Sequence, residues 1–117
     1  MQAYGAYFLQ AVTILIMNEP ELVLNELGRG AFLLKENGEK LAEMVVAIDE
    51  EYLFVYHTEV DPKAEGKGLA KILLNTMVAY ARSKHLKVVP LCPYVHAQFR
   101  RHPQEFADVW DGDEAAG

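Results

Sequence analysis

Residues 58–70 constrain the fold more than any other stretch of the chain. The stretch begins as the end of an apolar, β-branched strand, and Asp61-Pro62 stops that strand because proline has no amide to donate to a ladder. Gly66 and Gly68 follow, and an apolar helical pattern begins at Leu69. A strand, a glycine loop and a helix start, in this order, leave unpaired amides that can converge on an anion.

The predicted ligand of this loop is a pyrophosphate. Glycine at positions 66 and 68 permits positive φ and a close approach of the ligand. Lys63, Lys67 and Lys71 recur every four residues; they are either a solvated face or part of the anion site. Cations at a helix start oppose its dipole unless an anion is present, which favours the second interpretation. A Walker phosphate loop does not fit, because the sequence Gly-x-x-x-x-Gly-Lys-Ser/Thr is absent. A Rossmann fingerprint does not fit either, because the third glycine is missing.

Composition limits the classes of partner. With 117 residues, 51% of them hydrophobic, the chain can form one domain with one core. A net charge of −6 argues against nucleic acid as the main partner, and part of it falls in an acidic tail at 112–117. The single cysteine excludes an internal disulfide and fits a reducing cytoplasm, the predicted location.

Residues 1–16 form an atypical N-terminal extension, apolar and without charge. They lack the basic beginning and cleavage site of a signal peptide and are too short to span a membrane, so no membrane association is expected. Three alternatives remain open: an element covering apolar surface, a segment for self-association, or an unused start upstream of Met17. We favour the last, and expect a monomer or a weak dimer.

Hydrophobic alternation predicts an antiparallel meander of strands at 31–35, 41–48 and 52–60, while 21–27 is ambiguous. Asn37-Gly38 predicts a tight hairpin turn between the first two strands. The last strand is predicted to alternate throughout, with Tyr52, Phe54, Tyr56, Thr58 and Val60 on one face and Leu53, Val55, His57 and Glu59 on the other.

A helix is predicted at 69–84, ending at His85, and a short buried strand at 86–91. A crossover of this length makes that strand parallel to 52–60. Pro90 and Pro93 predict that its pairing then stops and that it splays away before a short helix at 94–101. The predicted fold class is therefore α/β (α+β), with a mixed sheet.

This order resembles the GNAT superfamily of acyl-CoA N-acyltransferases. Its loop motif is Gln or Arg, two residues, Gly, one residue, then Gly or Ala, and residues 63–68 (KAEGKG) match it with lysine first. Residues 56–60 (YHTEV) and 89–95 (VPLCPYV) look like its small single-domain branch, often called YjdJ-type. The resemblance covers roughly 20–110, which implies a GNAT-like domain at 17–111.

The resemblance implies binding of acetyl-CoA and transfer of acetyl to an amine, carried by a small molecule or a peptide. The pyrophosphate would lie on the amides of 64–70, and the pantetheine arm between strands 52–60 and 86–91. The implied cofactor-binding residues are Thr58, Val60, Lys63, Ala64, Gly66, Lys67, Gly68, Leu69, Ala70, Lys71 and Tyr94. The chain lacks the two helices that usually wall the acceptor site, so a CoA-binding module without turnover is the alternative.

Two side chains are candidates for catalysis, Cys92 and His57. The resemblance places Cys92 beside the thioester, where a thiolate could carry the acetyl group; it would need a cation or imidazole nearby, such as His57 or His96. A buried structural cysteine and direct attack by the amine are the competing interpretations. His57 is either a general base or a half-buried sheet residue. Three roles are open for Tyr94: it lines the acyl pocket, donates a proton to the leaving thiolate, or only packs in the core. No metal site is expected, because the spacing of histidines and cysteine is not ligand-like.

Overall fold

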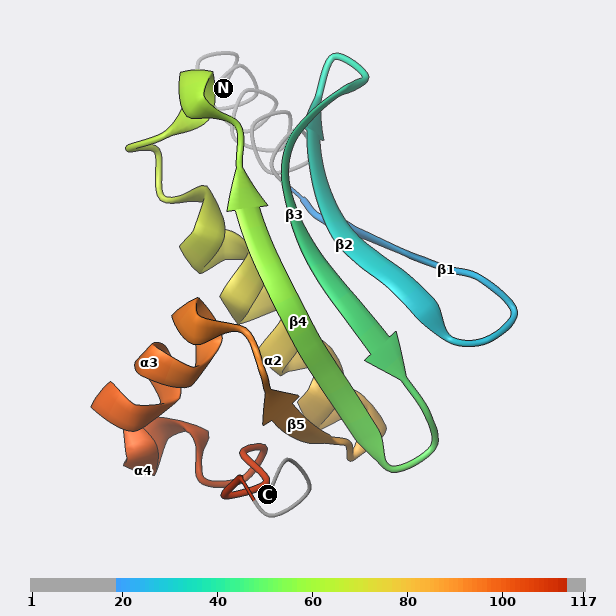
Figure 1. The fold of residues 1–117 in the computed structure, drawn as a ribbon, viewed down its shortest axis with the longest axis vertical. Helices are drawn as coiled ribbons and strands as arrows, with labels where there is room; N and C mark the ends of the chain where they lie inside the picture. Colours follow the sequence, from blue (N-terminus) through green and yellow to red (C-terminus); the bar gives the residue numbers. More distant parts are fainter. Residues whose placement is uncertain (1–18, 114–117) are drawn as a thin grey trace, which may run out of the picture.

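The computed structural model describes residues 19–113. Five strands form one sheet in the order β1-β2-β3-β4-β5, and the first four are antiparallel (Figure 1). The strands are β1 (Glu21–Leu24), β2 (Arg29–Glu36), β3 (Glu39–Ile48), β4 (Tyr52–Val60) and β5 (Lys87–Pro90). The helices are α2 (Leu69–Lys84), α3 (Pro93–Arg101) and α4 (Pro103–Phe106), with a 3₁₀ turn, η1 (Pro62–Ala64). The predicted mixed sheet and crossover are confirmed.

The meander has one strand more than the sequence predicted, because residues 21–24 pair with β2. Gly30 allows this pairing, since a Cβ built there would lie 1.8 Å from the Val23 carbonyl oxygen. The predicted hairpin turn is confirmed: Asn37 and Gly38 have φ of 53° and 79°, as a primed two-residue turn requires.

The core lies between one face of the sheet and the helices. Burial of apolar surface on both sides is the main force that holds the layers together. Figure 1 shows α2 running along β4 on that face. The fully buried side chains include Phe32, Leu34, Met44, Val46, Leu53 and Val55 from the sheet, Leu73, Leu74 and Met77 from α2, and Phe99 and Phe106 from the C-terminal helices. An ion pair on the surface, Arg82 with Asp108, joins α2 to the segment after α4.

The predicted alternation of β4 is wrong beyond Val55. Val46 pairs with Val55 but Val45 pairs with His57, so Tyr56 is an extra residue in a β-bulge. The bulge reverses the faces of the residues that follow. Thr58 now shares the face of the buried Val55 instead of lying opposite it, and His57 points outward. Sequence alternation carries no signal for the bulge, because the strand residues on both sides of it are equally suited to a sheet.

β5 accompanies β4 only as far as Val55, which pairs with Pro90. The Cys92 amide then donates to the Val55 carbonyl at 2.8 Å, and the chain turns into α3. The predicted splaying of this strand is confirmed. The other edge of β5 is covered by the C-terminal segment, since the Val88 amide donates to the Val109 carbonyl at 2.6 Å.

The expectations for residues 1–16 and for a start at Met17 lie outside the described residues, as does most of the predicted acidic tail. Within residues 19–113, no helix has the length and apolarity needed to cross a bilayer.

Candidate active site

The glycine loop lies between η1 and α2. The Asp61 carboxylate caps η1 by accepting the Lys63 amide at 3.0 Å, and the chain then passes through Gly66 and Gly68 with φ of 81° and 75°. A Cβ built at either glycine meets no atom of residues 19–113 within 4 Å. Glycine is therefore needed here for its backbone conformation, and the space above the loop is open.

The first turn of α2 borders this space and has no cap. Gly68 offers no side chain to its amides, the turn holds no acidic residue, and the first helical bond runs from Ile72 to the Gly68 carbonyl at 3.2 Å. The amides of 69–71 therefore have no acceptor within the helix. They border a cavity of about 240 Å³ lined by Val60, Ala64, Glu65, Gly66, Gly68, Leu69 and Ala70. An uncapped helix start at an open cavity is suited to an anion.

Of the three lysines predicted at the anion site, Lys63 is paired with a carboxylate and the other two are exposed. The ammonium of Lys63 forms an ion pair with Glu39, at the start of β3, and this hydrogen bond raises the pKa of Lys63. Its charge is therefore partly compensated. Lys67 and Lys71 are exposed on the loop and on the first turn of α2.

Beyond Val55, no strand among residues 19–113 pairs with the edge of β4 that faces the gap left by β5. The Asp61 amide donates to the Leu41 carbonyl of β3 at 2.8 Å. Because successive residues of a strand direct their amides to opposite edges, Thr58 and Val60 direct theirs into the gap. The two residues predicted to pair with an extended ligand therefore have their backbone groups oriented for it.

Three polar side chains meet where β4 and β5 separate. Cys92 is only 2% exposed, and its sulfur lies 3.3 Å from the Thr58 hydroxyl oxygen. Tyr94 follows on the first turn of α3, where burial, and to a smaller extent the Cys92 thiol, raises the pKa of its phenol. Both effects favour the protonated form of the phenol.

The two histidines considered as partners of Cys92 lie elsewhere. His57 points to the outward face of the sheet, 60% exposed, with its Nε2 3.7 Å from the Glu59 carboxylate. His96 instead contacts Asp113, with 3.0 Å between Nε2 and the carboxylate, and packs edge-on against Trp110. The structure thus brings Thr58 and Tyr94 to Cys92, and gives both imidazoles other partners.

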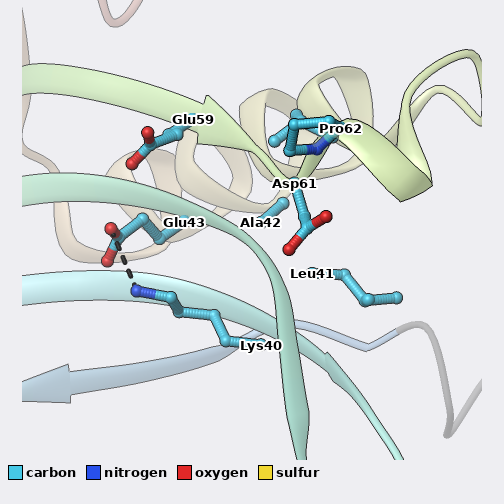
Figure 2. Close-up of a pocket in the computed structure, with 8 residues that line it drawn as sticks. Lys40, Leu41, Ala42, Glu43, Glu59, Asp61 and Pro62 are labelled. Carbon is cyan, nitrogen blue, oxygen red and sulfur yellow. Dashed lines mark ion pairs between the residues drawn. The ribbon is translucent and has the colours of Figure 1, made fainter.

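Sequence reasoning missed a second cavity, of about 240 Å³, between the start of β3 and the end of β4 (Figure 2). Its lining residues are Lys40, Leu41, Ala42, Glu43, Glu59, Val60, Asp61 and Pro62. Glu43 and Glu59 are directly opposite each other in the register of the two strands. The bulge sets this register, so the sequence alone could not place the two carboxylates side by side.

The chain is similar to two proteins of known structure. A protein from Staphylococcus aureus described as GCN5-like is similar to the chain, with 25% identity over 80% of this chain and 90% of that one and a TM-score of 0.57. The ribosomal-protein-S18-alanine N-acetyltransferase from Escherichia coli is 16% identical over 67% of this chain, with a TM-score of 0.48; the chain spans 58% of that enzyme's length. A search of curated proteins found no match.

The family assignment rests on a longer match. A family model, GCN5-related N-acetyl-transferase, matches residues 31–109, from β2 to the segment that covers the edge of β5. This is more than half of the chain, and it includes the glycine loop, the gap between β4 and β5, and Cys92. The resemblance seen in the sequence is confirmed: the chain belongs to the GCN5-related N-acetyltransferase family.

Proposed function

We propose that the chain is an acetyl-CoA-dependent N-acetyltransferase that transfers acetyl to an amine. One observation carries the proposal: the open glycine loop at the uncapped start of α2 lies at the end of a strand whose edge is free. The first feature fits a pyrophosphate and the second fits an extended arm. Both features belong to the stretch that the family model matches.

The residues present fit acetyl-CoA in three places. The amides of 66–71 would hold the pyrophosphate, with Lys67 and Lys71 adding positive charge. Thr58 and Val60 would pair with the pantetheine arm as a neighbouring strand does. The arm would then end at Cys92 and Tyr94, beside the Thr58 hydroxyl. When bound, acetyl-CoA supplies an activated acyl group.

The proposed route is direct attack by the neutral amine on the acyl carbon. The C–N bond forms as the C–S bond breaks, and the amine gives up a proton to the solvent. The Tyr94 phenol would donate its proton to the departing sulfur and then recover a proton from the solvent. Its raised pKa keeps the phenol protonated between turnovers. In the competing route the Cys92 thiolate would attack the acyl carbon and displace the CoA thiolate, and the amine would then attack the acetyl-cysteine and displace the Cys92 thiolate.

Direct attack is favoured by the surroundings of Cys92. Its thiol is buried and lies against a neutral hydroxyl, whereas a thiolate nucleophile needs a cation or an imidazole close by. His57 and His96 both contact carboxylates instead. For His57 we propose no role at the thioester, since its side chain projects from the opposite face of the sheet to Thr58.

Titration of acetyl-CoA into the full chain, followed by amide chemical shifts, tests the proposal. The largest changes are expected at 66–71 and at Thr58 and Val60. Release of free CoA, measured with a thiol reagent in the presence of an amine, then distinguishes an enzyme from a binding module. Binding at the loop with no amine-dependent release would favour the module; no change at the loop at saturating acetyl-CoA would refute both.

A further inference from the structure

The sheet has a second face, turned away from α2, which we call the outer face. Figure 1 shows α2 behind β4, and no helix of residues 19–113 crosses in front of β2 or β3. In an antiparallel sheet with one face in water, the side chains of that face are ordinarily polar. The outer face instead carries partly or largely exposed apolar side chains from four strands: Val23, Ala31, Leu33, Val45, Ala47, Tyr52, Phe54 and Tyr56.

These apolar side chains form a continuous band across the sheet. Val23 is opposite Ala31, and Ala31 is opposite Val45, so the three share one row across β1, β2 and β3. On β4 the rings of Phe54 and Tyr56 stack with 6.4 Å between their centroids. Val23 is 50% exposed and Tyr56 is 47% exposed. A contiguous exposed apolar patch of this kind marks an interaction surface.

The charged residues of the outer face lie at its two ends. At one end the register sets Leu33 between Glu21 and Glu43, and Glu59 follows on β4. The three glutamates have local partners at 3.1, 3.1 and 3.7 Å, namely Lys35, Lys40 and His57. A carboxylate can accept further bonds besides one of this kind. At the other end, the Arg29 guanidinium has no ion pair among residues 19–113. The two ends are therefore complementary in charge.

We propose that the outer faces of two copies of this chain pack against each other, as the two sheets of a sandwich do. The two-fold axis would run across the strands, along the row of Val23, Ala31 and Val45. This axis sets Arg29 of each copy against the acidic end of the other copy, so the favourable contact occurs twice. An axis along the strands would instead set the glutamates of one copy against those of the other. The proposal does not depend on acetyl transfer.

The size of the outer face fits a weak dimer. The central strands have 8 to 10 residues. With strands about 4.8 Å apart and a rise of about 3.3 Å per residue, the face measures roughly 20 Å by 25 Å. Packing two such faces together removes on the order of 1,000 Å² from water, which is near the lower limit for a specific interface. We therefore expect a Kd on the order of 10 µM.

Sedimentation equilibrium of the full chain, over concentrations that bracket this Kd, tests the proposal. Val45→Lys brings two ammonium groups together at the axis and should raise the Kd about 100-fold, because buried charges without partners are costly. Arg29→Glu replaces attraction by repulsion at both symmetric positions and should raise the Kd about ten-fold. Arg29 is exposed at the end of β2, so this variant decides the question even where Val45→Lys does not fold. The control is Arg101→Glu, the same charge change at an exposed position on α3, for which no change is expected.

Cross-linking with a short bis-maleimide tests the direction of the axis. Val45→Cys should be joined between copies, because a residue of the central row faces its own counterpart. Leu33→Cys lies one row away, roughly 13 Å from its counterpart across the axis, and should be joined about five-fold less. The native Cys92 is only 2% exposed and does not compete for the reagent.

Four results would overturn the proposal. The first is a full chain that stays monomeric at its highest soluble concentration. The second is a dimer whose Kd is the same in Val45→Lys and Arg29→Glu as in the parent. The third is a full-length monomer that dimerises once residues 1–16 are removed, which would assign the outer face to that segment. The fourth is equal cross-linking of Leu33→Cys and Val45→Cys.

Discussion

Replacing Gly68 with alanine should separate the conformational role of this glycine from its place in the proposed pyrophosphate site. Gly68 has φ of 75°, and an added Cβ would meet no atom within 4 Å. The only cost to folding is the left-handed conformation, about 1–2 kcal/mol for a residue with a side chain. For a domain of this size, each kcal/mol lowers the melting temperature by roughly 4–8 °C. The variant should therefore fold.

Acetyl-CoA binding should fall much further than stability. The alanine methyl would project into the open space above the loop, where a pyrophosphate oxygen would need to approach the amides. Losing one hydrogen bond to a charged group costs about 1.5–3 kcal/mol, so the Kd should rise roughly 10- to 100-fold. Calorimetric titration, well below the melting temperature of the variant, measures this change.

Gly38→Ala provides a matched control. Gly38 has φ of 79° and equally open surroundings, but it lies in the turn between β2 and β3. It should lose the same stability and bind acetyl-CoA as the parent chain does. If Gly68→Ala binds acetyl-CoA as tightly as Gly38→Ala, the loop does not hold the pyrophosphate, and the reasoning from its geometry is wrong.

Three further substitutions test the site and the fold. Cys92→Ala should keep most of the turnover if the amine attacks directly; a loss of a thousand-fold or so would instead require the covalent route. Tyr94→Phe should lower the turnover rate about 10²-fold with little change in acetyl-CoA affinity, and an unchanged rate would leave the phenol a packing residue. In the parent chain the ion pair with Arg82 lowers the pKa of Asp108. Asp108→Asn removes this pair, and urea titration at pH 7 should show that the free energy of unfolding falls by about 0.2–1 kcal/mol. That stabilisation is present above the ordinary carboxyl pKa and is lost as pH falls through the lowered one, so parent and variant should converge in acid; a difference that persists there would point to packing instead.

Much of the fold could be predicted because the signals for it are local. Asn37-Gly38 adopts the two positive φ values that a tight hairpin needs, and Asp61-Pro62 ends β4. His85 ends α2 in the left-handed conformation, with φ of 57°. Each of these effects acts within a few residues of the chain, so neighbouring strands are not needed to predict it.

The candidate site was predictable to the same extent. The position of the glycine loop before α2 follows from the order of residues, and so does the divergence of β5 near Pro90 and Pro93. The side chains that contact these features could not be predicted from the order of residues. Lys63 was expected at the anion site, but its ammonium pairs with Glu39 instead. The two residues are far apart in the sequence, and the pairing of β3 with β4 brings them together.

The sequence by itself determined that a strand, a glycine loop and a helix follow one another and leave free amides between them. Proline, with its fixed φ and missing amide, and glycine, without a Cβ, act on the backbone at their own positions. Only the tertiary structure decided the bulge at Tyr56. That bulge places the Thr58 hydroxyl beside the Cys92 thiol, turns His57 away from it and sets Glu43 opposite Glu59. Such contacts are decided by the register between strands, where one extra residue reverses the face of every residue that follows.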